Sequence, residues 1–213
     1  MKEYKIIDNI RISESTYVLS VKRDFEFVPG QIVSVTTNEK IAPRLYSICS
    51  GNKETDLKLL YSIKSEGQLT PQLSLLKSGN IVHISIPGGQ FKPAINNACW
   101  ISAGTGIAPF VSTIQSLECN NITLIHGARI IDDFYFSNIF EKFAGVDYIR
   151  CCSSSNNNVF YEGRLTQYLT EKDNLPVNQL YYLCGSAEMI VETRDILISK
   201  GISFSNIFSE IYF

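Results

Sequence analysis

The sequence predicts two domains: a six-stranded antiparallel β-barrel, followed by an α/β domain built on a five-stranded parallel sheet. The first half is a series of short segments with alternating or β-branched apolar residues, separated by turn residues. The second half alternates strand-like with helix-like segments, which is the pattern of βαβ units. Between the halves, Pro87-Gly88-Gly89 and Pro93 interrupt both patterns. We therefore expect the barrel over residues 1–93 and the α/β domain over residues 94–213.

The barrel is expected because six short strands with little helix between them favour closure into an antiparallel barrel. The expected strands are residues 4–12, 16–22, 31–36, 44–49, 57–63 and 81–86. One helix is expected over residues 70–76, where Pro71 fits the first turn because an N–H has no intrahelical acceptor there.

The parallel sheet is expected because each strand-like segment of the second half but the last is followed by a helix-like one, and such units cross over right-handedly. The expected strands are residues 99–103, 122–126, 146–150, 180–184 and 207–212. The expected helices are residues 108–117, 133–143, 163–169 and 187–199.

Composition excludes several classes of protein. The 213 residues are 45% hydrophobic and 19% charged, as in a globular chain, and no apolar run approaches the ~20 residues that cross a bilayer. The start of the chain has no signal-peptide core, so we expect a cytoplasmic protein. The six cysteines include no Cys-x-x-Cys pair and only two histidines are present, so no metal is expected. A net charge of −2 argues against nucleic acid as a partner.

Charge is unevenly distributed along the chain. Residues 1–95 carry 12 Lys and Arg against 9 Asp and Glu, whereas residues 96–213 carry 7 against 12. The first half is therefore the one expected to attract an acidic partner.

The segment Arg44-Leu45-Tyr46-Ser47 opens one of the barrel strands. Strand alternation puts Arg44 and Tyr46 on one face and Ser47 beside them on the other. A fixed planar cation, an aromatic platform and a small hydroxyl are the groups that a flavin dinucleotide requires for its diphosphate, its ring and N5. The alternative is an exposed strand with an ordinary arginine and tyrosine.

The segment from Ser102 to Phe110 contains Gly104-Thr105-Gly106 between a strand and a helix. The glycines allow a tight turn, and the following helix offers amides and a positive dipole to a phosphate. Pro109 occupies the place of the third glycine of the dinucleotide-binding pattern, and a plain tight turn is the alternative interpretation.

Two later segments also carry candidate chemistry. Cys184-Gly185 ends a parallel strand, where ligands of open α/β sheets bind and where a nicotinamide could lie. By position alone Cys184 could equally be a small buried apolar residue. The final Tyr212 and Phe213 suggest that aromatic rings cover a flat ligand, with simple strand packing as the competing explanation.

Taken in order, these segments resemble the ferredoxin–NADP reductase family, in particular its bacterial ferredoxin/flavodoxin reductase branch. The resemblance spans nearly the whole chain. It rests on Phe27-x-Pro-Gly30-Gln31, Arg44-x-Tyr46-Ser47, Gly67-Gln68-Leu69-Thr70-Pro71 with Leu76-Lys77-Ser78-Gly79, Gly104-Thr105-Gly106-x-x-Pro109, Cys184-Gly185 and Glu210-x-Tyr212-Phe213.

The resemblance implies an FAD domain over residues 1–93 and an NADP domain over residues 94–213. Arg44 would bind the pyrophosphate, Tyr46 would stack on the isoalloxazine and Ser47 would hydrogen-bond near N5. Tyr212 would cover the opposite flavin face, and Phe213 would stack on the adenine, which favours FAD over FMN. The residues implied to bind FAD are Arg44, Leu45, Tyr46, Ser47, Tyr61, Ile63, Gly67, Gln68, Leu69, Thr70, Thr105, Tyr212 and Phe213.

The resemblance also implies a catalytic set and a site for NADPH. The implied catalytic residues are Ser47, Cys184, Glu210 and Tyr212. The residues implied to bind the nicotinamide nucleotide are Gly104, Thr105, Gly106, Pro109, Arg129, Arg164, Cys184 and Gly185. Arg129 and Arg164 would grip the 2′-phosphate, although they could also be ordinary surface residues that form ion pairs.

One departure from the family pattern affects the choice of nucleotide. A third arginine usually grips the 2′-phosphate after the next parallel strand, where this chain has Cys151-Cys152. Losing one charge-assisted contact costs ~1.5–3 kcal/mol of preference for NADPH over NADH. We favour NADPH as the nucleotide, with NADH as the alternative.

The resemblance implies an FAD-dependent oxidoreductase that exchanges electrons between NADPH and ferredoxin or flavodoxin, an acidic carrier expected near the flavin domain. One alternative is a reductase component or electron-transfer subunit of an oxygenase or a larger enzyme. The other is a nucleotide-binding module without redox activity.

Overall fold

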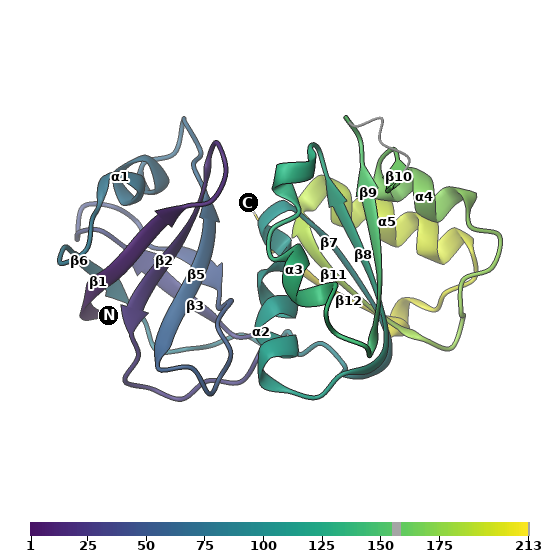
Figure 1. Cartoon of the computed structure of the whole chain (residues 1–213), viewed down its shortest axis with the longest axis horizontal. Coiled ribbons are helices and arrows are strands. Elements are labelled where there is room, and N and C mark those ends of the chain that lie inside the picture. The colour runs from purple at the N-terminus through teal and green to yellow at the C-terminus, as the bar shows by residue number, and fades with distance from the viewer. Residues whose placement is uncertain (155–158, 213) are drawn as a thin grey trace. The chain divides into compact units, whose positions relative to one another are not determined.

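The computed structural model describes residues 1–154 and 159–212, which form two compact units (Figure 1). The first unit contains residues 1–92 together with residues 108–116, and the second contains the rest of the described chain. The helix α2 (Ala108–Ser116) therefore belongs to the first unit, although it follows the first strand of the second.

The first unit is a barrel of six antiparallel strands in the order β4-β3-β6-β1-β2-β5. Its strands are β1 (Lys2–Arg11), β2 (Thr16–Lys22), β3 (Ile32–Thr36), β4 (Arg44–Ser47), β5 (Asp56–Ser62) and β6 (Ile81–Ile84). A bridge between Ile48 and Leu59 joins the two ends of this order, and the N–H of Cys49 donates to the carbonyl of Lys58 at 2.9 Å. The short helix α1 (Leu69–Leu75) lies between β5 and β6. The expected antiparallel barrel is confirmed.

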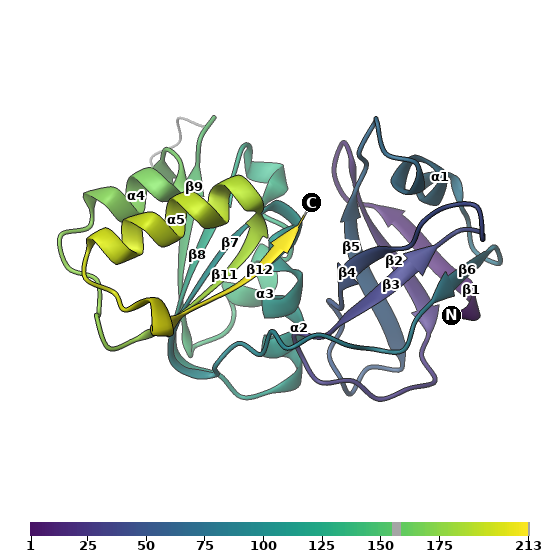
Figure 2. The ribbon, with the colours of Figure 1, turned by 180° about the vertical axis from the view of Figure 1, so that it is seen from behind.

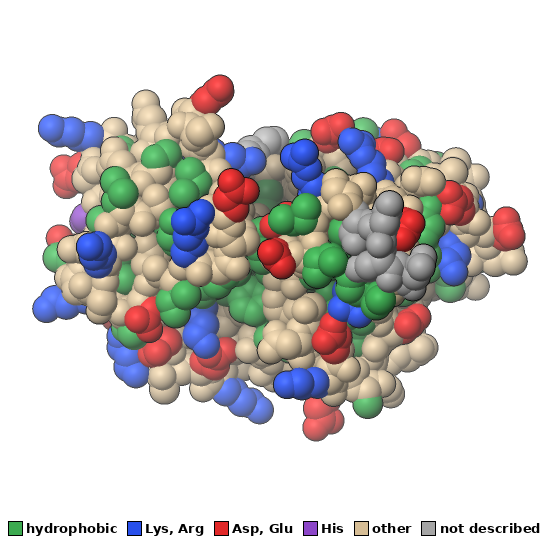
Figure 3. Space-filling view, turned by 45° about the horizontal axis from the view of Figure 1, so that its top comes forward, with side chains coloured by type: hydrophobic (Ala, Val, Ile, Leu, Met, Phe, Trp, Pro, Cys, Tyr) green, Lys and Arg blue, Asp and Glu red, His purple; other side chains and the backbone are tan. Residues whose placement is uncertain are grey.

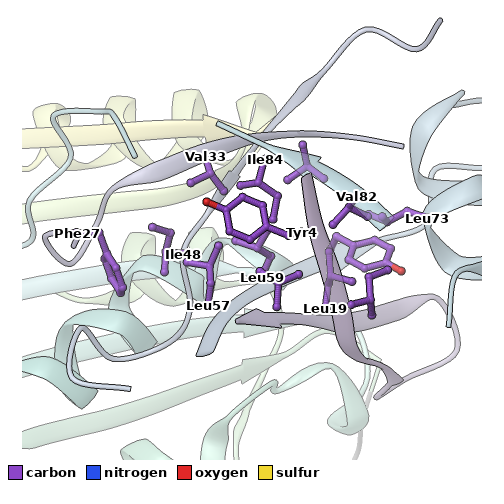
Figure 4. Close-up of a cluster of buried hydrophobic side chains, with 14 residues drawn as sticks. Tyr4, Leu19, Phe27, Val33, Ile48, Leu57, Leu59, Leu73, Val82 and Ile84 are labelled. Atoms are coloured by element: carbon purple, nitrogen blue, oxygen red, sulfur yellow. The ribbon is translucent and has the colours of Figure 1, made fainter. Parts of the chain in front are cut away.

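The barrel encloses one apolar core to which all strands contribute (Figure 4). Along β5, buried Leu57 and Leu59 alternate with half-buried Lys58, as the period of two requires. Each fully buried side chain of this size contributes roughly 1.5–3 kcal/mol of hydrophobic free energy. Leu73 of α1 reaches the same core, which fixes the helix against the strands.

The second unit is a six-stranded parallel sheet in the order β10-β9-β8-β7-β11-β12. Its strands are β7 (Asn96–Ala103), β8 (Asn120–Ala128), β9 (Val146–Cys152), β10 (Tyr161–Glu162), β11 (Leu180–Ser186) and β12 (Ile207–Tyr212). The parallel sheet is confirmed, with β10 added as a sixth strand that is too short to show any periodicity in the sequence. Trp100, at the centre of β7, is fully buried, and its indole N–H donates to the carbonyl of Ala94 at 3.0 Å.

The helices of the second unit pack on the two faces of its sheet (Figures 1 and 2). They are α3 (Ser137–Phe140), α4 (Leu165–Glu171) and α5 (Ala187–Ser199), with the 3-10 turns η1 (Gly104–Ile107), η2 (Ile131–Asp133) and η3 (Phe204–Asn206). Leu169 of α4 and Leu197 of α5 pack with Ile101 and Leu183 on one face, and α3 lies on the other. Among the described helices, none is long and apolar enough to cross a membrane.

Candidate functional site

The strand β4 presents the predicted Arg44–Ser47 group at one edge of the barrel sheet, beside β3. Arg44 is exposed and Leu45 is 64% exposed, whereas Tyr46 is half-buried and Ser47 is only 1% exposed. An exposed guanidinium next to a partly covered ring gives this strand a cation and a flat apolar surface that a ligand can reach.

The Tyr46 ring is held in place from inside the barrel by other tyrosines. Its ring meets that of Tyr61 edge-on at 6.3 Å, and Tyr61 stacks on Tyr17 at 5.5 Å. The Tyr61 hydroxyl donates to Oδ1 of Asn9 at 3.0 Å. Burial raises the pKa of Tyr46 to about 12, so its hydroxyl stays protonated at neutral pH. Tyr61 is 1% exposed and therefore supports Tyr46 from the core.

Sequence reasoning missed Tyr17 and Asn9, which complete this tyrosine cluster. The signal lies in the register, because Tyr17 of β2 is directly opposite Tyr61 of β5. Cross-strand aromatic pairs of this kind stabilise a sheet, but they can be found only when the register is known.

The segment from the end of β5 into the first turn of α1 carries the predicted residues from Ile63 to Thr70. The Gly67 N–H donates to the carbonyl of Lys64 at 2.8 Å, and the Thr70 hydroxyl accepts from the Lys64 N–H at 2.8 Å. Leu69 and Thr70 are buried and Gln68 is exposed, while the N–H of half-buried Ile63 donates to Ser15 at 2.7 Å. Because Leu69 and Thr70 are buried, a ligand at this turn would meet the backbone of Gly67 and the exposed side chains between Lys64 and Gln68.

The second unit contains a cavity of about 360 Å³ at the carboxyl ends of β7, β8, β9 and β11. The strand order reverses at β7, because β8 lies on one side of it and β11 on the other. Ligands of open α/β sheets bind at such a reversal, and the volume lies in the range of nucleotide and drug-sized pockets. The cavity is lined by Ala103, Gly104, Gly127, Ala128, Arg129, Asp133, Tyr135, Cys151, Ser153, Arg164, Leu165, Thr166, Ser186, Glu188, Met189 and Glu192.

Two different features of the backbone require glycine at the two positions after β7. Gly104 has φ +56°, a conformation that favours glycine, and a Cβ there would meet nothing within 4 Å, so backbone lines the cavity at this point. A Cβ on Gly106 would lie 2.1 Å from the carbonyl oxygen of Cys184. The turn η1 therefore packs directly on the end of β11. Thr105 is half-buried, and Pro109 is buried at the start of α2.

Both predicted arginines line the cavity, and both are exposed. Arg129 follows β8, and Arg164 precedes the first turn of α4. At the carboxyl end of β9 the cavity is lined by Cys151 and Ser153, so the side chains there are uncharged. Gly104 provides open backbone for a phosphate and the arginines provide charge, so the residues present fit a phosphorylated nucleotide.

The sequence reasoning did not place three carboxylates that also line this cavity, those of Asp133, Glu188 and Glu192. Asp133 accepts a hydrogen bond from the Tyr135 hydroxyl at 2.8 Å. Figure 3 shows acidic and basic side chains interspersed on the displayed face of the second unit. A helix-start pattern at Ser186 predicts where α5 begins, but not which of its side chains reach the cavity.

The predicted catalytic residues of the second unit lie together at the ends of β11 and β12. Cys184 is opposite Glu210 in the register, and Ser186 is opposite Tyr212. Cys184 is fully buried, and burial is the main cause that raises the pKa of its thiol, with the charge of Glu210 adding to it and a hydrogen bond with Tyr212 opposing it. Phe213 lies outside the described residues.

Two family patterns match the chain. Residues 3–92 match the family described as oxidoreductase FAD-binding domain, and residues 100–195 match the family described as oxidoreductase NAD-binding domain.

Among curated proteins, the chain is 28% identical to the toluate 1,2-dioxygenase electron transfer component of Pseudomonas putida, over 96% of this chain and 66% of that protein. It thus spans just under two thirds of that relative's length. It is 26% identical to ferredoxin–NADP reductase A of Sorangium cellulosum, over 85% of this chain and 76% of that one. Among solved structures, a ferredoxin NADP+ reductase from Neisseria gonorrhoeae with bound FAD and NADP superposes with a TM-score of 0.90 at 18% identity. That match covers 100% of this chain and 98% of the other, and it supports the fold.

Proposed function

Because this chain belongs to the ferredoxin–NADP reductase family, we propose that it is an FAD-dependent oxidoreductase that moves electrons between NADPH and a one-electron carrier such as ferredoxin or flavodoxin. The observation that carries the proposal is the cavity at the strand reversal, where the open backbone of Gly104 and the exposed Arg129 and Arg164 line one space. The proposed division is an FAD domain over residues 1–93 and a nucleotide domain over residues 94–213.

In the first unit, the proposed roles follow from exposure and charge. Arg44 neutralises the diphosphate of FAD, since its guanidinium is exposed and permanently charged. Tyr46 offers its ring, which Tyr61 keeps from turning, and Ser47 hydrogen-bonds near the flavin N5. Leu45, Ile63, Gly67, Gln68, Leu69 and Thr70 complete this proposed site.

In the second unit, the proposed roles concern the nicotinamide nucleotide. Gly104, Thr105, Gly106 and Gly185 shape the backbone around it, and Arg129 and Arg164 bind its phosphates. Pro109, which opens α2 of the first unit, is proposed to act with them. Cys184 and Glu210 flank the reacting ring, with Glu210 able to hold a proton, and Tyr212 orients the cofactor. The chemistry that FAD would supply when bound is hydride exchange with the nicotinamide and release of electrons one at a time, so the protein's contribution is alignment and exclusion of water.

The partner is proposed to be an acidic electron carrier that docks near the first unit, because residues 1–95 carry 12 Lys and Arg against 9 Asp and Glu, whereas the whole chain carries 19 against 21. A second candidate function is that of an electron-transfer component for an oxygenase or another larger enzyme. The similarity to the Pseudomonas putida protein favours it.

The first test is optical. Protein purified with FAD should be yellow, and under anaerobic conditions NADPH should bleach it. Candidate acceptors added next should restore the colour, and the acceptor that does so fastest separates the carrier reductase from the oxygenase component. Colourless protein that cannot take up FAD would leave only a nucleotide-binding module.

The second test examines Arg44. Arg44→Ala removes charge-assisted hydrogen bonds to a diphosphate, and FAD should bind roughly 10- to 100-fold more weakly. Lys5→Ala, which removes an exposed positive charge from β1, is the control and should leave FAD binding unchanged. Fluorescence titration of the apoprotein with FAD measures both. Equal FAD affinity in the two variants would remove Arg44 from the site.

A further inference from the structure

The cavity of the second unit contains more negative than positive side chains. Arg129 and Arg164 face Asp133, Glu188 and Glu192 around one space of about 360 Å³. None of these five charged groups forms an ion pair with another described residue. Cys151 at the end of β9 and Ser153 just after it also line the cavity, and both side chains are uncharged. The charge balance of the cavity therefore comes from these two arginines and three carboxylates.

Two of the carboxylates come from successive turns of one helix. Glu188 and Glu192 are four residues apart on α5, so they project from the same helix face, and both are exposed. The helix is anchored at its start, where the Ser186 hydroxyl accepts from the Met189 N–H at 3.3 Å. Met189 packs against the core of the second unit, which fixes how α5 is rotated. The two glutamates are thus held at the cavity by the packing of the helix.

The two possible nucleotides differ in charge at a single position. The 2′-phosphate of NADPH carries about −1.5 to −2 charges at neutral pH, as other phosphate monoesters do. The 2′-hydroxyl of NADH is neutral and can donate a hydrogen bond to a carboxylate. A cavity of this volume is roughly as wide as the Debye length, about 10 Å at 0.1 M salt, so charges on its walls act on the whole ligand.

We propose that Glu188 and Glu192 are specificity determinants that weaken the binding of 2′-phosphorylated dinucleotides, so that NADH is accepted beside NADPH. The inference rests on the proposed function, because it concerns the same nucleotide cavity. Two carboxylates that repel the 2′-phosphate would thus act in addition to the absence of a third arginine. Groups that repel the wrong ligand are a common source of specificity.

The experiment uses the full chain with both glutamates changed, Glu188→Gln with Glu192→Gln. Calorimetric titration with NADP+ and with NAD+ gives the ratio of their dissociation constants without any turnover. The double variant should bind NADP+ about 3- to 10-fold more tightly, from the loss of two screened repulsions, and NAD+ should gain less because it lacks the 2′-phosphate. The gain should shrink at high salt, which a change of packing would not produce.

The matched control is Glu118→Gln, which removes an exposed carboxylate just before β8, at the amino end of that strand, whereas the cavity lies at its carboxyl end. It should leave the ratio unchanged. Equal tightening of NADP+ and NAD+, or no tightening of either, would overturn the assignment of Glu188 and Glu192. If neither nucleotide binds to the unchanged protein, the proposed function fails instead.

Discussion

His126 is a buried histidine in β8, and no role in the proposed reaction requires it. It is fully buried, its Nδ1 lies 2.9 Å from the Tyr148 hydroxyl, and the Phe134 ring meets it edge-on at 5.2 Å. Burial lowers its pKa to about 3, and the nearby Arg150 adds to the effect. The imidazole is therefore neutral in the folded protein at any pH near neutrality.

This burial makes folding sensitive to acid. In the unfolded chain His126 takes up a proton below pH ~6.5, but the folded protein does so only near pH 3. Stability is therefore lost as the pH falls through this interval, by about 1.4 kcal/mol per pH unit. Urea unfolding at pH 6.5 and pH 5 should show that His126→Gln removes roughly 2 kcal/mol of this loss.

The control for this prediction is His83→Gln, which replaces the half-buried histidine of β6. This variant should still lose stability as the pH falls. An equal loss in the protein and in the His126→Gln variant would show that other groups cause the acid sensitivity.

The sequence predicts single residues well where a motif fixes their place on the backbone. The resemblance to the reductase family implied that Arg129 and Arg164 bind the nucleotide, and both line the cavity. Glu188 and Glu192 could not be predicted, because the face of α5 that reaches the cavity depends on packing against the sheet. Whether Cys184 has a catalytic role stays a prediction, since its full burial suits either interpretation.

The elements that sequence predicts to the residue have clear boundary signals. The strands β2 and β12 and the helix α5 begin and end as expected. For α5 the signal is Ser186, a preferred residue at a helix start, and its hydroxyl does cap the helix.

Other elements were misjudged because the signals are not local. A continuous helix was expected over residues 133–143, and this was wrong: the chain forms η2 and then the four-residue α3. The break lies at Phe136, whose φ of 61° is left-handed and ends any helix that reaches it. An aromatic residue gives no sequence signal for that conformation.

The packing of η1 on β11 gives a prediction at the scale of elements. In Gly106→Ala the new Cβ would overlap the backbone of Cys184 and Gly185, so the turn and the strand end must separate. The free energy of unfolding should fall by about 1–3 kcal/mol, the usual effect of overpacking. Chemical denaturation measures this. Gly88→Ala, where a Cβ meets nothing within 4 Å, should be nearly neutral, and equal stability of the two variants would contradict the close approach.

At the scale of the whole molecule, the sequence could not predict that α2 belongs to the first unit, because α2 follows the first strand of the second unit in the chain. The Ser112 hydroxyl donates to the carbonyl of Ser50 at 2.8 Å, and the Gln115 amide donates to that of Cys49 at 3.0 Å. These contacts join residues more than sixty positions apart, so no local pattern reveals them. The two fold classes, in contrast, follow from periodicity alone, and the motif order then indicated the family.

The two units should respond separately to ligands. Adenosine 2′,5′-bisphosphate resembles only the adenosine part of NADPH, so it should stabilise the loops around the cavity of the second unit, by about 2.7 kcal/mol at a hundredfold excess over its dissociation constant. Hydrogen exchange should slow at residues 103–106, 127–129 and 164–166, with β1 and β2 unchanged. Protection confined to the barrel strands would place the nucleotide in the first unit and contradict this prediction.

The chain has a single tryptophan, and its position at the centre of β7 gives the protein an internal optical reporter. With its indole dry and its N–H fixed, Trp100 should emit at short wavelength while that sheet is intact, and shift to the red when water enters. Fluorescence excited selectively in tryptophan therefore follows the melting of the parallel sheet. Residues 1–93 contain no tryptophan, so the barrel must be followed by circular dichroism instead.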